Sequence, residues 1–264
     1  MRRRARLLLA VVVVGCALAG AQRCTVGEVR RADGSFALGR CEELSLLGET
    51  IGDEGARALA KALAANERLR LLDLWRNGIG AEGARALATA LAGSPTLERL
   101  YLNENRVGAE GARALAGALE RNSRLTTLWL SRNGVGDAGA QALADALRTA
   151  RTLQVLDLWE NGIGPPGAEA LAGALHVNGA LRTLELRGNR LGDAGAAAFA
   201  AAMPRNHVLS TLDLIGTGCT ARGTARLRAG LGEAAANPYL VVFEDGLPRQ
   251  QWTSWQQKGK TNAP

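Results

Sequence analysis

Residues Leu69–Thr96 read LRLLDLWRNGIGAEGARALATALAGSPT, and this stretch decides the fold because it recurs along most of the chain. Leucine returns every 28 residues, at positions 69, 97, 125, 153, 181 and 209. A fixed period of this length indicates a solenoid, in which equivalent structural units stack on one another.

Each repeat combines a strand pattern with a helix pattern. Leu72 and Leu74 alternate with other residues, which indicates a short strand with one apolar face. Past the turn glycines, apolar residues recur at the spacing of one helix face: Ala84, Leu87, Ala88 and Leu91. One repeat cannot bury both faces alone, so neighbouring repeats must share a core. Because a helix is wider than the ~4.8 Å between paired strands, we expect an α/β solenoid in a short horseshoe arc, with parallel strands on the concave face and helices on the convex face.

An asparagine follows each predicted strand at the same point of the repeat. We expect this asparagine column to be structural, because a buried amide can satisfy backbone groups that are left unpaired where the strand turns away. The first and last repeats carry Glu49 and Thr217 at this position. The column consists of Asn77, Asn105, Asn133, Asn161 and Asn189.

The repeat L-x-x-L-x-L-x-x-N-x-(I/V/L)-G-x-x-G-A-x-A-L-A-x-A-L resembles the leucine-rich repeat of the ribonuclease-inhibitor type. It is similar to the repeats of ribonuclease inhibitor, of Ran GTPase-activating protein and of the C-terminal regions of NOD-like receptors. The resemblance covers roughly residues 41–243 and implies seven 28-residue leucine-rich repeats plus a terminal strand. It does not imply one function, because proteins of this architecture bind different partners.

The N-terminal segment is predicted to be a signal peptide. Four arginines precede an apolar run, and the small residues Ala19, Gly20 and Ala21 indicate cleavage before Gln22. An uncleaved anchor, a lipoprotein signal at Cys16 and a twin-arginine signal are the alternatives. We therefore expect a secreted protein or one in an organelle lumen, in preference to a cytoplasmic one. The predicted organisation is a signal peptide at 1–21, an N-terminal cap hairpin at 22–40, seven leucine-rich repeats at 41–236, a C-terminal cap strand at 237–248 and a polar tail at 249–264.

Two cysteines bracket the predicted cap. Asp33 and Gly34 stand between two short β-like runs, which predicts a hairpin. In an oxidising compartment, a disulfide between Cys24 and Cys41 would hold this hairpin over the end of the core, and two free thiols are the alternative. Cys219 replaces an aliphatic residue of other repeats, so we expect a small buried hydrophobe there.

The sequence offers no catalytic set. Its two histidines, His176 and His207, lie in different repeats. Residues 259–261 (GKT) resemble the end of a phosphate loop but lack its first glycine and a following helix. We expect no enzymatic activity, no metal and no cofactor. Residues 1–21 hold four of the 32 basic residues and none of the 25 acidic ones, so the formal charge of +7 falls to +3 without them, which argues against a nucleic-acid partner.

Residues beside the inward leucines are predicted to face the concave surface. Tryptophan and tyrosine gather there on four successive strands, as a band about 15 Å across. Large aromatics with charged neighbours of both signs are typical of a protein-binding hot spot. Tiling of the sheet by cross-strand packing and stacking on a carbohydrate are the alternatives. The predicted partner-binding residues are Asp73, Trp75, Arg76, Arg99, Tyr101, Trp129, Arg132, Asp157, Trp159, Glu185 and Arg187.

We therefore expect a non-enzymatic recognition or scaffold protein that binds another protein on its concave face. One alternative is a regulator of an enzyme, either a hydrolase inhibitor or a small-GTPase activator, as the resemblance implies. Another is a structural subunit of a membrane or organellar complex, with Trp252 and Trp255 of the tail as its anchor. Contact with a membrane and the oligomeric state stay open.

Overall fold

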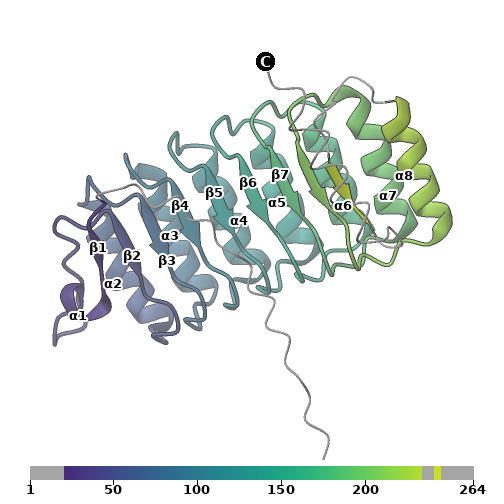
Figure 1. Ribbon diagram of the computed structural model, residues 1–264. Helices are drawn as coiled ribbons and strands as arrows, with labels where there is room; N and C mark the ends of the chain where they lie inside the picture. Colours follow the sequence, from purple (N-terminus) through teal and green to yellow (C-terminus); the bar gives the residue numbers. More distant parts are fainter. Residues whose placement is uncertain (1–20, 234–240, 245–264) are drawn as a thin grey trace, which may run out of the picture.

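The computed structural model describes residues 21–233 and 241–244. Their strands form one parallel sheet, in which each strand pairs with the next along the chain (Figure 1). The predicted solenoid of seven repeats and a terminal strand is confirmed, because the seven strands after the first each precede a helix. The strands are β1 (Arg23–Cys24), β2 (Glu43–Ser45), β3 (Leu71–Asp73), β4 (Arg99–Tyr101), β5 (Thr127–Trp129), β6 (Val155–Asp157), β7 (Thr183–Glu185), β8 (Thr211–Asp213) and β9 (Val241–Phe243).

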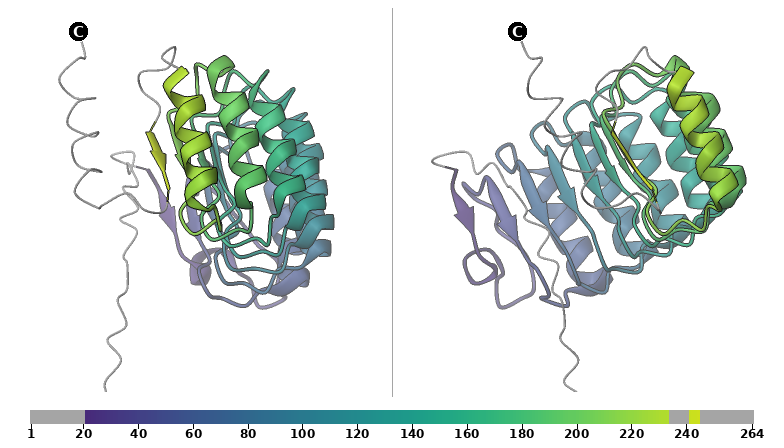
Figure 2. Two further views of the ribbon diagram at one scale, coloured as in Figure 1. Left: turned by 90° about the vertical axis from the view of Figure 1, so that its right-hand side faces the viewer. Right: turned by 45° about the vertical axis from the view of Figure 1, so that its right-hand side comes forward.

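The helices form a second layer on one side of the sheet, as two further views show (Figure 2). Each long helix packs against the next, so that strands line the inside of the arc and helices its outside. The helices are α1 (Val26–Val29), α2 (Gly52–Ala64), α3 (Ala81–Gly93), α4 (Gly108–Leu119), α5 (Gly136–Leu147), α6 (Pro165–Leu175), α7 (Gly192–Ala202) and α8 (Ala221–Glu233), with the 3-10 helix η1 (Met203–Arg205) after α7.

The strand leucines and the apolar helix faces share one core. Leu72 and Leu74 are fully buried, and the register places Leu72 beside its equivalent Leu100 on the next strand. Ala84 and Leu87 of α3 fill the space between the two layers. Because these leucines are fully buried, replacing one of them by alanine leaves a cavity and is expected to lower the free energy of unfolding by about 2–5 kcal/mol.

A glycine in each repeat lets neighbouring helices approach closely. At Gly111, a Cβ atom would lie 2.9 Å from Cβ of Ala84 in the preceding helix and 2.7 Å from Cγ1 of Val107. Both distances are shorter than van der Waals contact. The glycine before the helix alanine is therefore required for the packing of α4 on α3.

The N-terminal cap differs in part from the predicted hairpin. Cys24 lies in β1, which pairs parallel with β2, and the next run is the one-turn helix α1 instead of a hairpin arm. The Glu28 carboxylate accepts hydrogen bonds from the backbone N–H of Thr25 at 2.6 Å and from its hydroxyl at 2.9 Å, and these contacts favour a helical turn over an extended run. A tight turn does follow, because Arg30 and Phe36 form an antiparallel bridge.

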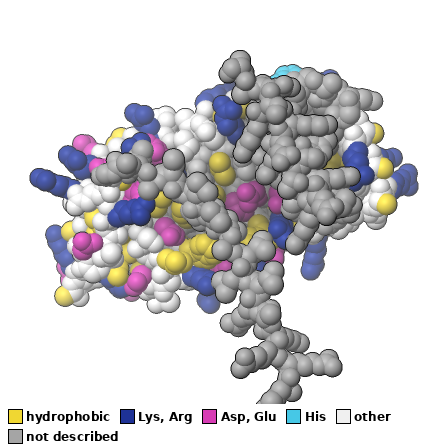
Figure 3. All heavy atoms as spheres, in the orientation of Figure 1, with side chains coloured by type: hydrophobic (Ala, Val, Ile, Leu, Met, Phe, Trp, Pro, Cys, Tyr) yellow, Lys and Arg dark blue, Asp and Glu magenta, His cyan; other side chains and the backbone are white. Residues whose placement is uncertain are grey.

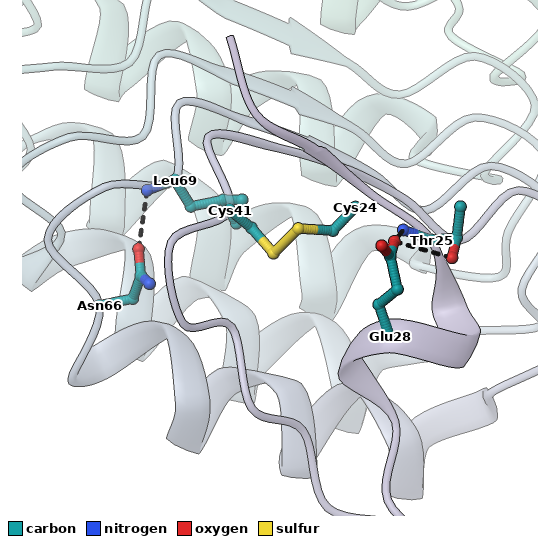
Figure 4. The surroundings of a disulfide bond; sticks show 6 residues. All are labelled: Cys24, Thr25, Glu28, Cys41, Asn66 and Leu69. Atoms are coloured by element: carbon teal, nitrogen blue, oxygen red, sulfur yellow. Dashed lines mark hydrogen bonds between the residues drawn. A yellow bond between two sulfur atoms is a disulfide. The ribbon is translucent and has the colours of Figure 1, made fainter.

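A disulfide joins the cap to the first repeat in the structure. It links Cys24 to Cys41, whose Cα atoms lie 5.7 Å apart (Figure 4). Cys41 is 3 % exposed and belongs to the core. The bond therefore holds β1 against the end of the solenoid core.

The two predicted terminal segments fall outside the described residues. These are the signal peptide, apart from its last residue, and the tail at 249–264 with Trp252 and Trp255. Within the part of the chain that the structure describes, no helix combines the length and the hydropathy needed to cross a membrane.

Candidate protein-binding face

The side chains opposite the helices form rows, because the 28-residue period places equivalent residues on neighbouring strands side by side. Figure 3 shows this sheet face, with hydrophobic side chains on part of it and acidic side chains beside them. The first row is Leu71, Arg99, Thr127, Val155, Thr183 and Thr211. The second row is Asp73, Tyr101, Trp129, Asp157, Glu185 and Asp213. The third row is Trp75, Asn103, Ser131, Trp159, Arg187 and Ile215, and the turn row after it is Arg76, Glu104, Arg132 and Glu160.

Tyr101 and Trp129 are neighbours in the second row, and their rings stack. The ring centroids lie 4.1 Å apart and the ring planes meet at 16°. Tyr101 is 9 % exposed, whereas Trp129 is half-buried. Burial raises the pKa of the Tyr101 phenol, so the ring stays neutral at physiological pH. This stacked pair forms a flat apolar surface on β4 and β5.

The four predicted aromatic residues do not form one continuous band. The stacked pair is the one ring-on-ring contact among the described residues. Trp75 and Trp159 lie in the third row, just after β3 and β6, and the buried Asn103 and Ser131 stand between them. Spacing along the sequence predicted the shared face, but the assignment to different rows separates the two outer tryptophans from the stacked pair.

Arginines lie over the two outer tryptophans. The guanidinium of Arg132 lies 4.7 Å from the ring centroid of Trp159, and that of Arg187 lies 6.0 Å from it. Arg76 lies 5.9 Å from the Trp75 ring. These distances are within the range of cation–π attraction. Each outer indole is therefore bordered by positive charge.

The turn row forms a chain of ion pairs along one edge of the sheet face. Arg76 Nε lies 2.6 Å from Glu104 Oε2, Arg132 Nη1 lies 3.4 Å from Glu104 Oε1, and Arg132 Nε lies 2.6 Å from Glu160 Oε2. The hydrogen bond from Arg76 lowers the pKa of Glu104, so that carboxylate stays ionised.

The turn row also has a left-handed backbone. The φ angles are 57° at Arg76, 53° at Glu104, 55° at Arg132 and 50° at Glu160. For a residue other than glycine, this left-handed conformation costs of order 1 kcal/mol. Strained backbone positions of this kind cluster at functional sites. Gly48, Gly188 and Gly216 occupy the equivalent turns in the flanking repeats. The predicted partner-binding residues include the two arginines of this row but not Glu104 and Glu160. The alternation of charge at a fixed period was the available signal for these two glutamates.

The first-row arginine Arg99 is linked to the cap strand β1 through a shared carboxylate. Arg99 Nη2 lies 3.1 Å from Glu43 Oε1 of β2, and the other oxygen of Glu43 lies 3.0 Å from Arg23 Nε. Arg99 therefore shares its counter-ion with the cap strand.

The acidic residues of the second row differ in their surroundings. Asp73 accepts hydrogen bonds from the Ser45 hydroxyl at 2.9 Å and from the backbone N–H of Trp75 at 3.1 Å. Asp157 accepts a hydrogen bond from the backbone N–H of Trp159 at 2.9 Å, and burial raises the pKa of Asp157 to about 6. Among the described residues, no group of three His, Cys, Asp or Glu side chains is placed to hold a metal ion.

Glu185 has the most perturbed carboxylate of the second row. Burial raises the pKa of Glu185 to about 7, and the neighbouring charges of Asp157 and Asp213 act in the same direction, against the attraction of Arg187. Asp157 and Glu185 therefore titrate near neutral pH.

The asparagine column makes the hydrogen bonds expected of it. Asn133 Oδ1 accepts from the Val107 N–H at 3.2 Å, and its Nδ2 donates to the carbonyls of Leu102 at 2.8 Å and Leu130 at 3.0 Å. These bonds link one repeat to the repeat before it. The column supports the sheet face from beneath.

A second column of polar side chains was missed from the sequence. Asn122 Oδ1 accepts from the backbone N–H groups of Arg124 at 2.8 Å and Leu125 at 2.7 Å, and its Nδ2 donates to Leu91 of the preceding repeat at 2.6 Å. The 28-residue spacing was the available signal, interrupted by an alanine at position 150. The members are Asn66, Ser94, Asn122, Asn178 and Asn206, all buried.

Two solved structures illustrate the similarity to known proteins. The leiomodin-1 actin-binding site 2 structure is 18% identical, with a TM-score of 0.48, and the match covers 69% of this chain and 98% of that chain. The tropomodulin C-terminal domain of Caenorhabditis elegans is 16% identical, with a TM-score of 0.45 and coverage of 52% and 83%. A comparison with curated proteins found no match.

A family model described as leucine rich repeat matches the chain five times in succession. The matched residues are 65–88, 93–116, 121–144, 149–172 and 180–200. The first four matches begin 28 residues apart, and all five fall on the strand and helix units of the solenoid. The chain belongs to the leucine-rich-repeat proteins.

Proposed function

We propose that the chain is a non-enzymatic module that binds another protein on its sheet face. The observation that carries this proposal is the stacked pair of Tyr101 and Trp129, which lies on the sheet surface and not in the core between the layers. Aromatic residues and arginine are enriched at protein interfaces, and the strongest contacts cluster near an interface centre.

The surroundings of the stacked pair support this reading. Trp75 and Trp159 border it on either side, each with an arginine within 6.0 Å of its ring. The ion-paired turn row lies along one edge. A partner lying across β3–β6 would therefore meet rings at the centre and charged groups at the rim, over about 15 Å.

The test removes the half-buried tryptophan rings of the sheet face and leaves the core intact. Trp75→Ala, Trp129→Ala and Trp159→Ala are combined in one variant, and protein retained from an extract of the source cells is compared with the amount retained by the unchanged chain. Val177→Ala is the control, because Val177 is a hydrophobic residue that is 55 % exposed and follows helix α6.

We expect the triple variant to lose the retained partner while its melting temperature stays within about 8 °C, and the control to retain it. Loss of the fold in the triple variant would show that the rings are structural. Unchanged retention by a folded triple variant would contradict the proposal.

We also propose that the protein is exported into an oxidising compartment. The disulfide between Cys24 and Cys41 and the N-terminal pattern of arginines and apolar residues support this. N-terminal sequencing is expected to begin at Gln22, and thiol alkylation is expected to modify these two cysteines only after reduction. An intact N-terminus on a cytosolic protein with free thiols would contradict export.

A further inference from the structure

The charges on the sheet face are unevenly compensated. Three of its arginines, Arg76, Arg99 and Arg132, form ion pairs with glutamates, whereas the charge of Arg187 attracts Glu185. Within residues 21–233 and 241–244, no ion pair involves Asp157 or Glu185. Excess negative charge is therefore concentrated on β6 and β7.

These acidic residues continue the row that holds the stacked pair. Trp129 pairs with Asp157 across β5 and β6, and Asp157 pairs with Glu185 across β6 and β7. Asp213 follows on β8. With strands ~4.8 Å apart, a chain laid across the sheet passes from two stacked rings to successive carboxylates within about 20 Å.

We infer that this second row recognises a basic, aromatic segment of the partner, with an apolar ring on the stacked pair of Tyr101 and Trp129 and an arginine or lysine side chain against Asp157 and Glu185. The inference rests on the proposed function and adds the chemistry of the partner. Charge complementarity selects a cation, because Arg187 is one positive charge beside the two carboxylates of Asp157 and Glu185, while Arg76, Arg99 and Arg132 already have counter-ions.

Arginine suits this position better than lysine. Its planar guanidinium binds carboxylates in a bidentate way and also stacks on aromatic faces. The face already contains such a contact, because Arg132 lies 4.7 Å from the Trp159 ring centroid. A partner arginine beside Trp129 and Asp157 would repeat it.

Proton linkage gives the site a distinctive signature. Burial raises the pKa of both Asp157 and Glu185, and the charge of Asp213 adds to both shifts. The backbone N–H of Trp159 acts against the shift at Asp157, and Arg187 acts against the shift at Glu185. A bound cation favours the ionised carboxylates. Binding therefore releases protons near neutral pH and weakens as the pH falls from about 8 to about 5.

Two synthetic peptides test the partner chemistry on the full chain by calorimetry. One repeats the unit Arg-Trp-Gly and the other repeats Glu-Trp-Gly, so that they differ only in charge. The variants are Asp157→Asn and Glu185→Gln, which keep the side-chain shape. Glu169→Gln is the control, because Glu169 is an exposed carboxylate on α6, on the opposite layer.

We expect the arginine peptide to bind with proton release at about pH 7 and the glutamate peptide to bind about tenfold more weakly or not at all. The double variant is expected to lose about tenfold in affinity and the proton release, and the control to lose neither. Equal binding of both peptides, no binding of the arginine peptide, or full affinity of the double variant would overturn the inference.

Other occupants give different results. If the arginine peptide binds only after Arg249, Lys258 and Lys260 are changed to glutamine, the occupant is the chain's own tail, and the inference of a separate partner is wrong. If the arginine peptide dissociates a dimer of the chain, as measured by sedimentation velocity, a second copy of the chain occupies the sheet face, and the inference is again wrong. If the inference fails while the Trp129→Ala chain still loses its partner, the proposed function stands without it.

Discussion

The ring of Tyr101 stacks on the indole of Trp129 across adjacent strands, with 4.1 Å between the centroids. The two residues are 28 positions apart in the sequence and face the same side of the sheet. The contact is a product of the repeat, because only an unchanged period places both residues in one row.

Truncation of this pair is expected to affect binding more than folding. Trp129→Ala removes a ring from the surface but leaves Leu128 and Leu130 buried, so the free energy of unfolding should fall by about 1 kcal/mol. Partner affinity should fall at least about tenfold. Urea unfolding and the affinity for the retained partner are the two measurements. A fall in stability of core-leucine size with unchanged affinity would contradict this prediction.

The left-handed turn row predicts an unusual order of stabilities. At Arg132, φ is 55°, so alanine would lose the ion pairs and keep the strain, whereas glycine would lose the ion pairs and relieve the strain. We expect Arg132→Gly to be more stable than Arg132→Ala by about 1 kcal/mol in urea unfolding.

The control for this order is Arg113 on the exposed side of α4. There glycine should be less stable than alanine by about 1 kcal/mol, because the backbone is helical. The same order at both sites would show that the left-handed turns carry no strain.

The raised pKa of Glu185 predicts how stability changes with pH. The folded chain holds the Glu185 proton up to about pH 7, whereas the unfolded chain releases it near 4.5. Between these values the folded state binds more protons, so its stability is highest at the acid end and falls as the pH rises. Glu185→Gln should flatten this fall between about pH 5 and about pH 8 in chemical unfolding. An unchanged slope would contradict the assigned environment.

The asparagine column is expected to carry a large part of the repeat stability. Asn133→Ala leaves the carbonyls of Leu102 and Leu130 and the N–H of Val107 without the Asn133 side chain as their partner. Because these groups are buried, the loss should be about 3 kcal/mol in urea unfolding. Gln141→Ala on the exposed side of α5 is the control and should change stability by less than about 0.5 kcal/mol. Similar losses at both positions would argue against the structural role.

The cap predicts a response to reduction. Closing the loop between Cys24 and Cys41 should stabilise the folded chain by about 3 kcal/mol in the chain-entropy model. The melting temperature should therefore fall on reduction of the unchanged chain, and a Cys24→Ala variant should not respond. A melt that is insensitive to reductant would show that the bond is absent or that the cap melts separately.

The repeat made most of the fold predictable. Leu72 and Leu74 are buried where the strand pattern placed them, and the asparagine column makes inter-repeat hydrogen bonds. The cap was harder, because the capping contacts of Glu28 to Thr25 turn a β-like run into a helix. Local side-chain hydrogen bonds of this kind compete with strand propensity and leave no periodic signal.

The sequence predicted which residues share the candidate site but not which of them are in contact. Parity along each strand identified the face that holds Tyr101, Trp129 and Trp159. Whether two rings touch depends on the row that each occupies and on competing neighbours, and Arg132 covers Trp159 instead of another ring. The left-handed backbone of the turn row was also hidden, because arginine and glutamate rarely adopt that conformation.

Photo-crosslinking from single positions tests the location of the binding face most directly. A photoreactive residue replaces Thr127, which lies in the first row beside the stacked pair, or Arg113, which lies on the helix layer. The account predicts a covalent adduct with the partner from position 127, none from position 113, and loss of the adduct when Trp129→Ala is added. An adduct from position 113 alone, or one from position 127 that persists without the Trp129 ring, would contradict it.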